Sequence, residues 1–371
     1  MDVSLSMFKN TDKRWIWLGL GITMVLLRYI LGFYPEMIER FYSRGLYIGI
    51  RWILDYTVAF LPVPSLYVFI FSLLFWGLYR LFRKRKAGLL WWQRILQFLF
   101  STLAFLSGVV FFFLVLWGFN YGRIPLEDQI DIKPKPLDRR ELLEELSFFT
   151  PKLMENRRLV STDSFPLDAQ DLPEDLHPQI RKVVEANLLD MGYPDAGEPR
   201  LRQLRPQGVL LRISTAGFYM PLTGECHVDA GLHPIQLPFV MAHEYYHAYG
   251  FTDEGSCNFM AFLACIRSED AFIRYAGYMG YWRYLAGGYR QADRKIYGSY
   301  YRSLPLELRK DLKAIRDRMD EFPDILPEVR NLAYNTYLKA QGIEEGIKNY
   351  SRIVMLAAAW RKKEKNDLLP K

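Results

Sequence analysis

The chain has 371 residues, of which 50% are hydrophobic and 16% aromatic. It is long enough for two domains and too apolar for a disordered protein. The formal net charge is +7, and residues 1–118 account for the excess, with thirteen basic and five acidic side chains. These basic residues flank apolar segments, as they do in membrane proteins. The charge therefore does not indicate nucleic-acid binding, and we expect a lipid bilayer as a partner.

Three segments are long and apolar enough to cross a bilayer: residues 15–34, 62–82 and 95–117. The third segment contains no charged residue. The first is too long and too rich in tryptophan for a cleaved signal peptide, so we expect it to stay in the mature protein. Together the three segments predict an α-helical membrane anchor over residues 1–118.

The basic residues also predict an orientation. Three of them precede the first segment, and the run Arg83–Lys86 follows the second. The positive-inside rule places both groups in the cytoplasm. Three crossings of an inner or cell membrane then put residues 119–371 in the periplasm or outside the cell. The loop at residues 35–64 is predicted to form an amphipathic helix on the outer surface.

Beyond the anchor, the sequence predicts a linker and a soluble domain. Residues 119–165 carry four prolines around a charged helical stretch, which indicates a linker with a docking helix. Residues 166–371 contain segments with the two-residue periodicity of strands and segments with the 3.6-residue periodicity of helices. We expect a strand at Gly208–Ser214 and two strands about a Thr-Gly turn within Phe218–Gly231. Because the chain after Pro238 is mostly helical in pattern, the predicted fold class is α+β, mostly helical with a small sheet.

The chemistry concentrates in the motif HEYYH. Pro238 suits the first turn of a helix and Gly250 its C-terminal end, so the motif lies in a helix of about three turns. His243 and His247 share one face of that helix, where both imidazoles can bind one Zn²⁺ ion. Glu244 is placed to take a proton from metal-bound water, so we predict that it is the catalytic base. With five histidines in the chain, a chance HExxH is expected roughly 0.004 times.

A catalytic zinc site needs a third protein ligand, and two neighbouring acids qualify. Asp253 completes HExxHxxGxxD, in which Gly250 lets the chain turn back to the metal. Glu254 begins the next helix and forms ExxxN with Asn258, similar to the ExxxD of gluzincins, in which the acid binds zinc and the second residue orients a histidine. We favour Glu254, with Asn258 behind the ligands, and keep Asp253 as the alternative. Either acid also suits the start of a helix as its N-cap or first-turn residue.

Other candidate residues lie outside this stretch. Tyr337, Tyr350 and Arg352 fall in one segment near the C-terminus, and any of them would suit an oxyanion or substrate contact. The strand expected at Cys226–Ala230 precedes the motif closely enough to be the edge strand that pairs with an extended substrate in zincins. A plain core hairpin is the alternative for that strand.

The three cysteines, Cys226, Cys257 and Cys265, are too few for a disulfide framework and lack CxxC spacing. Cys257 and Cys265 are eight residues apart and share a helix face, which favours buried thiols. A bridge between Cys226 and Cys257 is the alternative.

Several longer segments resemble an uncharacterised family of membrane-anchored HExxH proteins, a domain of unknown function typical of Bacteroidetes. The segments are YPEMIERFYSRGLY, WGFNYGR, PLTGE, LPFVMAHEYYHAYGF, CNFMAFLACI and YLKAQGIEEGIKNYSRIV, and they span nearly the whole chain. The resemblance implies a zincin-like peptidase domain on a three-helix anchor and gives no substrate. The family's second helix begins similarly to EDEANF, so Glu254 and Asn258 match that pattern, whereas Gly255, Ser256 and Cys257 depart from it.

These observations predict a membrane-anchored zinc metallopeptidase that hydrolyses peptide bonds in envelope or extracytoplasmic proteins and peptides. The alternative is a catalytically inactive, zincin-like pseudopeptidase that binds a partner protein or peptide without cutting it. The intact HExxH motif favours the enzyme, and the departures at the second helix favour the binding protein.

Overall fold

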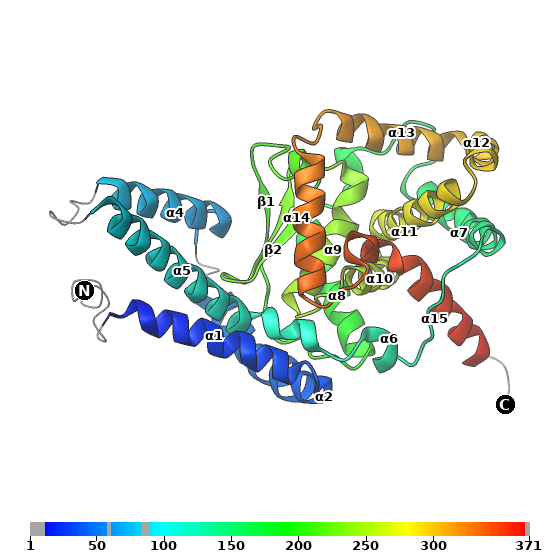
Figure 1. The fold of residues 1–371 in the computed structure, drawn as a ribbon. Helices are drawn as coiled ribbons and strands as arrows, with labels where there is room; N and C mark the ends of the chain where they lie inside the picture. The colour runs from blue at the N-terminus through cyan, green and yellow to red at the C-terminus, as the bar shows by residue number, and fades with distance from the viewer. Residues whose placement is uncertain (1–11, 58–60, 83–89, 368–371) are drawn as a thin grey trace. The chain divides into compact units, whose positions relative to one another are not determined.

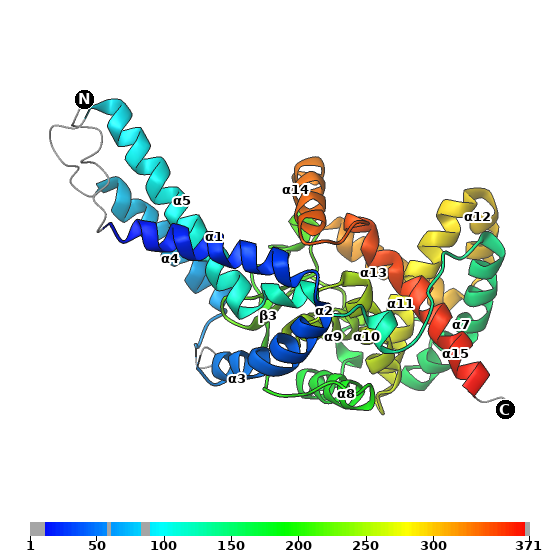
Figure 2. The ribbon, with the colours of Figure 1, turned by 60° about the horizontal axis from the view of Figure 1, so that its bottom comes forward.

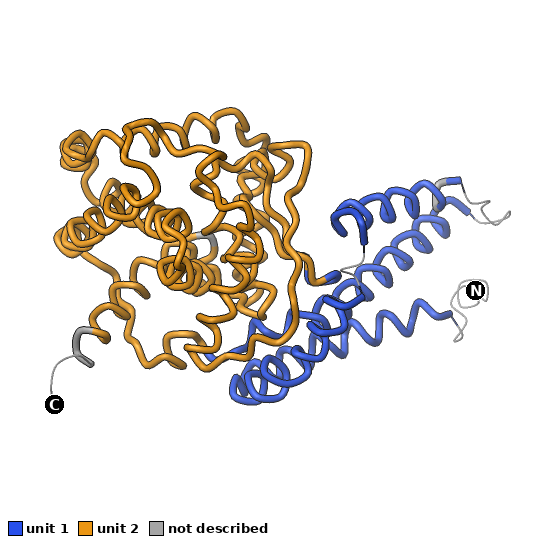
Figure 3. The backbone as a smooth tube through the Cα atoms, turned by 180° about the vertical axis from the view of Figure 1, so that it is seen from behind, with its two compact units in different colours: residues 1–124, 221–223 blue, residues 125–220, 224–371 orange. Residues whose placement is uncertain are grey.

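The computed structural model describes residues 12–57, 61–82 and 90–367. These residues form two compact units, which Figure 3 distinguishes by colour. Unit 1 comprises residues 1–124 with the short segment 221–223, and unit 2 comprises residues 125–220 and 224–371. The HEYYH motif and both acidic candidates therefore belong to unit 2.

Unit 1 is built from helices in its described residues. They are α1 (Arg14–Leu31), α2 (Pro35–Met37), the π-helix η2 (Ile38–Leu46), α3 (Tyr47–Thr57), α4 (Ser65–Phe82), α5 (Trp91–Leu116) and the 3-10 helix η4 (Gly118–Gly122) (Figure 1). The segment predicted as an amphipathic helix is helical over α2, η2 and α3, and its buried Arg51 and Asp55 form an ion pair. Its place on a membrane surface stays a prediction.

Two helices of unit 1, α1 and α5, are long and apolar enough to cross a membrane by length and composition. They correspond to the first and third predicted spans. The second predicted span, residues 62–82, is corrected, so the described residues hold two candidate spans and not three. The apolar part of α4 is Ser65–Tyr79, which extends about 22 Å as a helix, whereas a hydrocarbon core is about 30 Å thick.

Helices α1 and α5 pack closely because small residues line their contact. A Cβ atom added at Gly21 would lie 2.8 Å from the Cβ of Ser107, so the two backbones approach too closely for any larger residue. One residue further along α5, Gly108 faces the ring of Trp17. Contacts of this kind are typical of helix pairs in membranes, where close van der Waals packing drives association.

Unit 2 combines many helices with a small sheet, which agrees with the predicted α+β class. Its first helices are α6 (Leu126–Gln129), α7 (Arg139–Val160), η5 (Ala169–Asp171), α8 (Leu176–Asp190), η6 (Leu211–Ile213) and η7 (Pro234–Gln236). The later ones are α9 (Leu237–Ala248), α10 (Glu254–Ile266), α11 (Ala271–Ala292), α12 (Arg294–Ser303), α13 (Leu306–Asp320), α14 (Pro327–Ala340), η8 (Gly346–Arg352) and α15 (Ile353–Asp367). Helix α10 is central, since α8, α9, α11 and α15 all pack against it (Figure 2).

The segment predicted as a linker, residues 119–165, contributes α7 to this unit. Asp138 caps the helix by accepting a hydrogen bond from the backbone N–H of Glu141. Along its length α7 packs on α11, where Trp282 donates a hydrogen bond of 2.9 Å to Thr150. The predicted docking helix is therefore the first part of a longer helix in the core of unit 2.

The sheet has three strands, β1 (Leu201–Leu204), β2 (Gly217–Met220) and β3 (Glu225–Asp229), in the order β1-β3-β2. β3 runs parallel to β1 and antiparallel to β2, with Gly217 opposite Val228. The two strands predicted about the Thr-Gly turn are thus β2 and β3. The role predicted for Cys226–Ala230 as an edge strand is wrong, because β3 lies between the other two strands and β2 forms an edge.

The strand predicted at Gly208–Ser214 is also wrong, because this segment forms a loop with the short helix η6. The buried carboxylate of Asp229 accepts hydrogen bonds from the backbone N–H groups of Gly208, Leu210 and Leu211 at 2.7–3.1 Å. Gly208 has a φ of +85°, which favours glycine. Because these N–H groups bind one side chain, they are not available to pair with a neighbouring strand. The third strand of the sheet is β1 instead.

Candidate metal centre

Helix α9 places the two motif histidines on one buried face. His243 and His247 are one turn apart, and their Nε2 atoms lie 3.0 Å from each other. Pro238 stands in the first turn of the helix, where its missing N–H has no consequence. Gly250, with a φ of +83°, follows the end of α9 and lets the chain reverse into α10. The predicted helix and its two ends are confirmed.

Glu254, the first residue of α10, brings a carboxylate to the two imidazoles. Its Oε2 atom lies 3.1 Å from Nε2 of His243 and 3.2 Å from Nε2 of His247. Among the described residues these three buried side chains form the group of ligand-type atoms that could hold a metal ion. Burial alone would raise the pKa of Glu254, but the neighbouring imidazoles lower it below its usual range.

The other nitrogen of each imidazole has an acceptor of its own. Nδ1 of His243 lies 2.9 Å from Oδ1 of Asn258, and Nδ1 of His247 lies 2.9 Å from the carbonyl oxygen of Phe251. The amide of Asn258 is oriented by its Nδ2 group, which donates to the hydroxyl of Tyr284 and the carbonyl of Tyr350. Each histidine therefore carries a proton on Nδ1, and its Nε2 atom faces the carboxylate.

Three ligand-type atoms thus converge at about 3 Å in a buried place. Burial lowers the pKa of His247, but the nearby Cys257 and Glu254 raise it well above its usual value, so the cluster attracts a cation, either a proton or a metal ion. Two neutral imidazoles and one carboxylate are the donor set of many catalytic zinc sites, and acceptors behind the Nδ1 protons are the usual support of zinc-binding histidines. The residues present therefore fit a zinc ion.

Asp253, the alternative third ligand, has other partners. Its Oδ1 atom caps α10 by accepting hydrogen bonds of 2.7 Å from the backbone N–H and the hydroxyl of Ser256. Its Oδ2 atom accepts from Asn349 at 2.7 Å and forms an ion pair with Arg352 at 3.1 Å. The structure therefore brings Glu254, and not Asp253, to the histidines. Arg352 also pairs with Glu127, so it anchors the loop at the start of α10.

Glu244 lies beside the cluster, fully buried against strand β2. A Cβ atom added at Gly217 would lie 2.4 Å from Oε1 of Glu244, so only glycine leaves room for the carboxylate. The Oε2 atom is buried and has no hydrogen-bond partner among the described residues. Burial raises the pKa of Glu244, although the two histidines act in the opposite direction. An unsatisfied buried carboxylate of this kind is typical of a site that acts on a bound molecule.

Two tyrosines complete the wall of the site. The hydroxyl of Tyr334 donates a hydrogen bond of 2.7 Å to Oε1 of Glu254 and lies 3.0 Å from the hydroxyl of Tyr350. The ring of Tyr350 stacks on that of His243, with centroids 6.2 Å apart. Burial and the nearby Glu254 raise the pKa values of Tyr334 and Tyr350 well above the usual range, so both hydroxyls keep their protons.

The sequence named Tyr350 as a candidate and missed Tyr334. It named Tyr337 instead, which is one turn further along α14, is 37% exposed and stacks on Tyr334. Helical spacing alone groups the two tyrosines, and only the packing of α14 decides which one faces Glu254. All three cysteines are buried and form no disulfide bond with one another, so the favoured interpretation of buried thiols agrees with the structure.

The fold and the cluster define an α+β unit with an HExxH helix and a third acidic residue on the following helix. The chain belongs to the family described as a protein of unknown function (DUF3810), whose model matches residues 42–358. No curated protein and no solved structure matches the chain.

Proposed function

We propose that unit 2 is a zinc-dependent peptidase in which His243, His247 and Glu254 hold the metal. The observation that carries this proposal is the convergence of these three side chains, because both Nδ1 atoms have acceptors of their own and both Nε2 atoms face Glu254. Zinc, when bound, would act as a Lewis acid and make water a nucleophile near neutral pH.

The side chains around the cluster have separate roles in this proposal. Glu244 would take a proton from the attacking water and deliver it to the leaving amine, since its carboxylate lies beside the ligands and has an unused oxygen. Tyr350 would donate a hydrogen bond to the carbonyl oxygen as negative charge develops on it, and Tyr334 would hold the carboxylate of Glu254. Asn258 would hold His243 in its orientation.

Strand β2 is the element that would bind the peptide backbone of the substrate. The carbonyl oxygen of Ala216 accepts a hydrogen bond from the backbone N–H of Asp229. Because hydrogen-bonded and non-hydrogen-bonded residue pairs alternate along antiparallel strands, the backbone N–H and C=O of the next residue, Gly217, point away from β3. Gly217 also touches Glu244. An extended peptide that pairs with this edge would therefore pass directly over the proposed base.

The proposal also includes a membrane anchor. Helices α1 and α5 of unit 1 would hold the protein in the bilayer. The extracytoplasmic location of unit 2 depends on an odd number of crossings and stays a prediction. A reporter fused after residue 371 tests it, because two crossings return the chain to the side of its N-terminus and three do not.

Metal content measured by mass spectrometry on the full chain in detergent tests the metal site. We expect one zinc ion per chain in the wild type and in Asp253→Asn, and loss of zinc in Glu254→Gln. A wild type that binds no zinc after reconstitution would overturn the proposal. Glu244→Gln should keep its zinc and lose hydrolysis of a peptide library. A zinc-bearing wild type that cuts no peptide would favour the alternative, a binding protein.

A further inference from the structure

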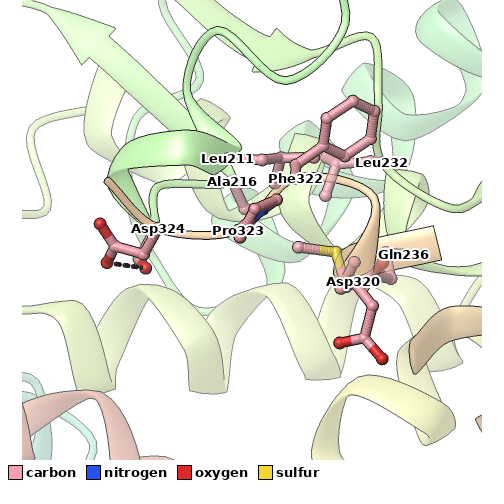
Figure 4. Close-up of a pocket in the computed structure, with 10 residues that line it drawn as sticks. Leu211, Ala216, Leu232, Gln236, Asp320, Phe322, Pro323 and Asp324 are labelled. Carbon is pink, nitrogen blue, oxygen red and sulfur yellow. Dashed lines mark hydrogen bonds between the residues drawn. The ribbon is translucent and has the colours of Figure 1, made fainter. Parts of the chain in front are cut away.

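A pocket opens in unit 2 beside the start of strand β2. It has a volume of about 400 Å³ and is lined by residues of the loop before β2, the turn before α9 and the end of α13 (Figure 4). This volume falls within the range of about 300–1,000 Å³ that is typical of ligand sites. The pocket does not include the metal cluster and has no part in the chemistry proposed above.

The pocket lies next to the proposed active site. Ala216 lines it, and the next residue, Gly217, touches Glu244. On the other wall, Gln236 lines the pocket and stands eight residues before Glu244. Gln236, Val240 and Glu244 follow at four-residue spacing and share one face of the α9 region. Eight residues of helix correspond to about 12 Å, the length of three to four residues of extended peptide.

The pocket combines apolar walls with carboxylate, amide and hydroxyl groups. Leu211 and Leu232 are buried and, with the ring of Phe322, form the apolar side. The lining includes two carboxylates, Asp320 and Asp324, and no lysine or arginine (Figure 4).

The polar groups of the pocket differ in what they already bind. Asp324 accepts a hydrogen bond from Ser214 and pairs with Arg330 at 3.2 Å. Asp320 is exposed, and the described residues give it no ion-pair partner. The side-chain oxygen of Gln236 is buried without a hydrogen-bond partner in the described part of the chain. The pocket thus offers one unpaired carboxylate and one unsatisfied carbonyl.

Two arginines lie near the pocket without lining it. Arg212 and Arg318 stand over the ring of Phe322 at 5.8 and 5.1 Å. Arg318 is held by Glu321 and by the carbonyl oxygen of Gly231, to which it donates at 2.8 Å. Arg318 is therefore held outside the pocket, and neither arginine forms an ion pair with Asp320 or Asp324 among the described residues.

We propose that this pocket is a substrate subsite that accepts a lysine or arginine side chain of the peptide. A long basic side chain has an aliphatic stem, which suits Leu211, Leu232 and Phe322, and a cationic head with donors only, which suits Asp320 and Gln236. The basic residue would lie within one to about four residues of the scissile bond, given the distances from Ala216 and Gln236 to Glu244. This inference rests on the proposed peptidase function.

Binding can be measured separately from cleavage. The full-length Glu244→Gln protein in detergent is titrated with fluorescein-labelled Ala/Gly decapeptides in which a single arginine occupies each position in turn. A second set carries citrulline, which has the same shape without the charge, and a third carries norleucine. We expect at least one arginine peptide to bind about tenfold more tightly than its citrulline partner, as a charge-assisted hydrogen bond would give.

Substitutions assign the preference to the pocket. Asp320→Asn, made in the same background, should remove the preference for arginine over citrulline. Asp317→Asn is the matched control, because Asp317 lies on the same helix, is exposed and pairs with Lys313 outside the pocket. The subsite is refuted if arginine and citrulline peptides bind equally, if norleucine binds as tightly as arginine, or if Asp320→Asn keeps the preference.

Cleavage by the wild type separates this inference from the proposed function. Cleavage without a basic residue near the cut sites would overturn the subsite and leave the peptidase intact. A preference in binding that depends on Asp320, without cleavage of any peptide, would overturn the peptidase and keep the basic subsite as the binding site of a non-catalytic protein.

Discussion

The hydroxyl of Tyr334 donates a hydrogen bond of 2.7 Å to Oε1 of Glu254, while Oε2 of the same carboxylate faces the two histidines. The two residues are 80 positions apart in the chain. Helix α14 is thereby joined to the start of α10 at the candidate metal centre. A ligand carboxylate keeps one orientation when the oxygen that faces away from the metal is hydrogen-bonded, and a catalytic metal site requires such a fixed orientation.

Replacing Tyr334 by phenylalanine removes this hydrogen bond with little change in shape. We expect the Tyr334→Phe protein to keep one zinc ion and to lose about 10- to 100-fold in kcat/KM, because partners behind a metal ligand contribute to that extent. Peptide hydrolysis beside metal analysis measures both. Tyr301→Phe, on α12, should match the wild type. A larger loss in Tyr337→Phe than in Tyr334→Phe would show that the assignment of the tyrosine is wrong.

Asn258 fixes the orientation of His243, because its Oδ1 atom lies 2.9 Å from Nδ1 of the imidazole. We expect Asn258→Leu to lower zinc affinity about 10- to 100-fold, since the Nδ1 proton loses its partner in a buried place. Competition with a chromogenic chelator measures this affinity. Asn258→Asp retains an acceptor oxygen and should bind zinc more tightly than Asn258→Leu. Equal affinities in the two variants would contradict the proposed role.

The space beside Glu244 depends on glycine at position 217. A methyl group there would meet the carboxylate, so Gly217→Ala should displace Glu244 while the zinc ligands stay in place. We expect kcat/KM to fall roughly 100-fold, as it does when a catalytic group moves by about 1 Å, with zinc content unchanged. Gly287→Ala is the control, because a Cβ atom there meets nothing within 4 Å. Full activity in Gly217→Ala would argue against Glu244 as the base.

The ion pair of Arg157 and Asp311 joins α7 to α13 inside unit 2. Both side chains are fully buried, and Asp311 also accepts hydrogen bonds from Tyr275 at 2.6 Å and from the backbone N–H of Leu167 at 2.9 Å. We expect Asp311→Ala to lower the free energy of unfolding by about 3–5 kcal/mol, because Arg157 would remain buried without a counter-charge. Denaturant unfolding followed by tryptophan fluorescence measures the change.

The control for this experiment is Asp317→Asn, which removes an exposed ion pair on the same helix. Its effect should be within about 0.5 kcal/mol of the wild type, since exposed pairs contribute little. If Asp311→Ala were no more destabilised than this control, the buried pair would not be a main support of the packing of α7.

The sequence by itself determined the features that depend on local patterns. HEYYH between Pro238 and Gly250 specifies a helix with both histidines on one face, since helical periodicity and end signals act within a few residues. Long apolar runs identify α1 and α5 as candidate spans for the same reason. The Thr-Gly turn with its flanking strands is likewise a short-range signal.

The tertiary structure decided what depends on partners far along the chain. Asp253 and Glu254 are adjacent acids, and Asp253 is turned aside because Ser256, Asn349 and Arg352 bind its carboxylate. Strand β3 is central only because β1, more than twenty residues earlier, pairs with it. Asp253 binds Ser256 locally, but its ties to Asn349 and Arg352 and the pairing of β1 with β3 follow from contacts between distant segments, which no local pattern in the sequence contains.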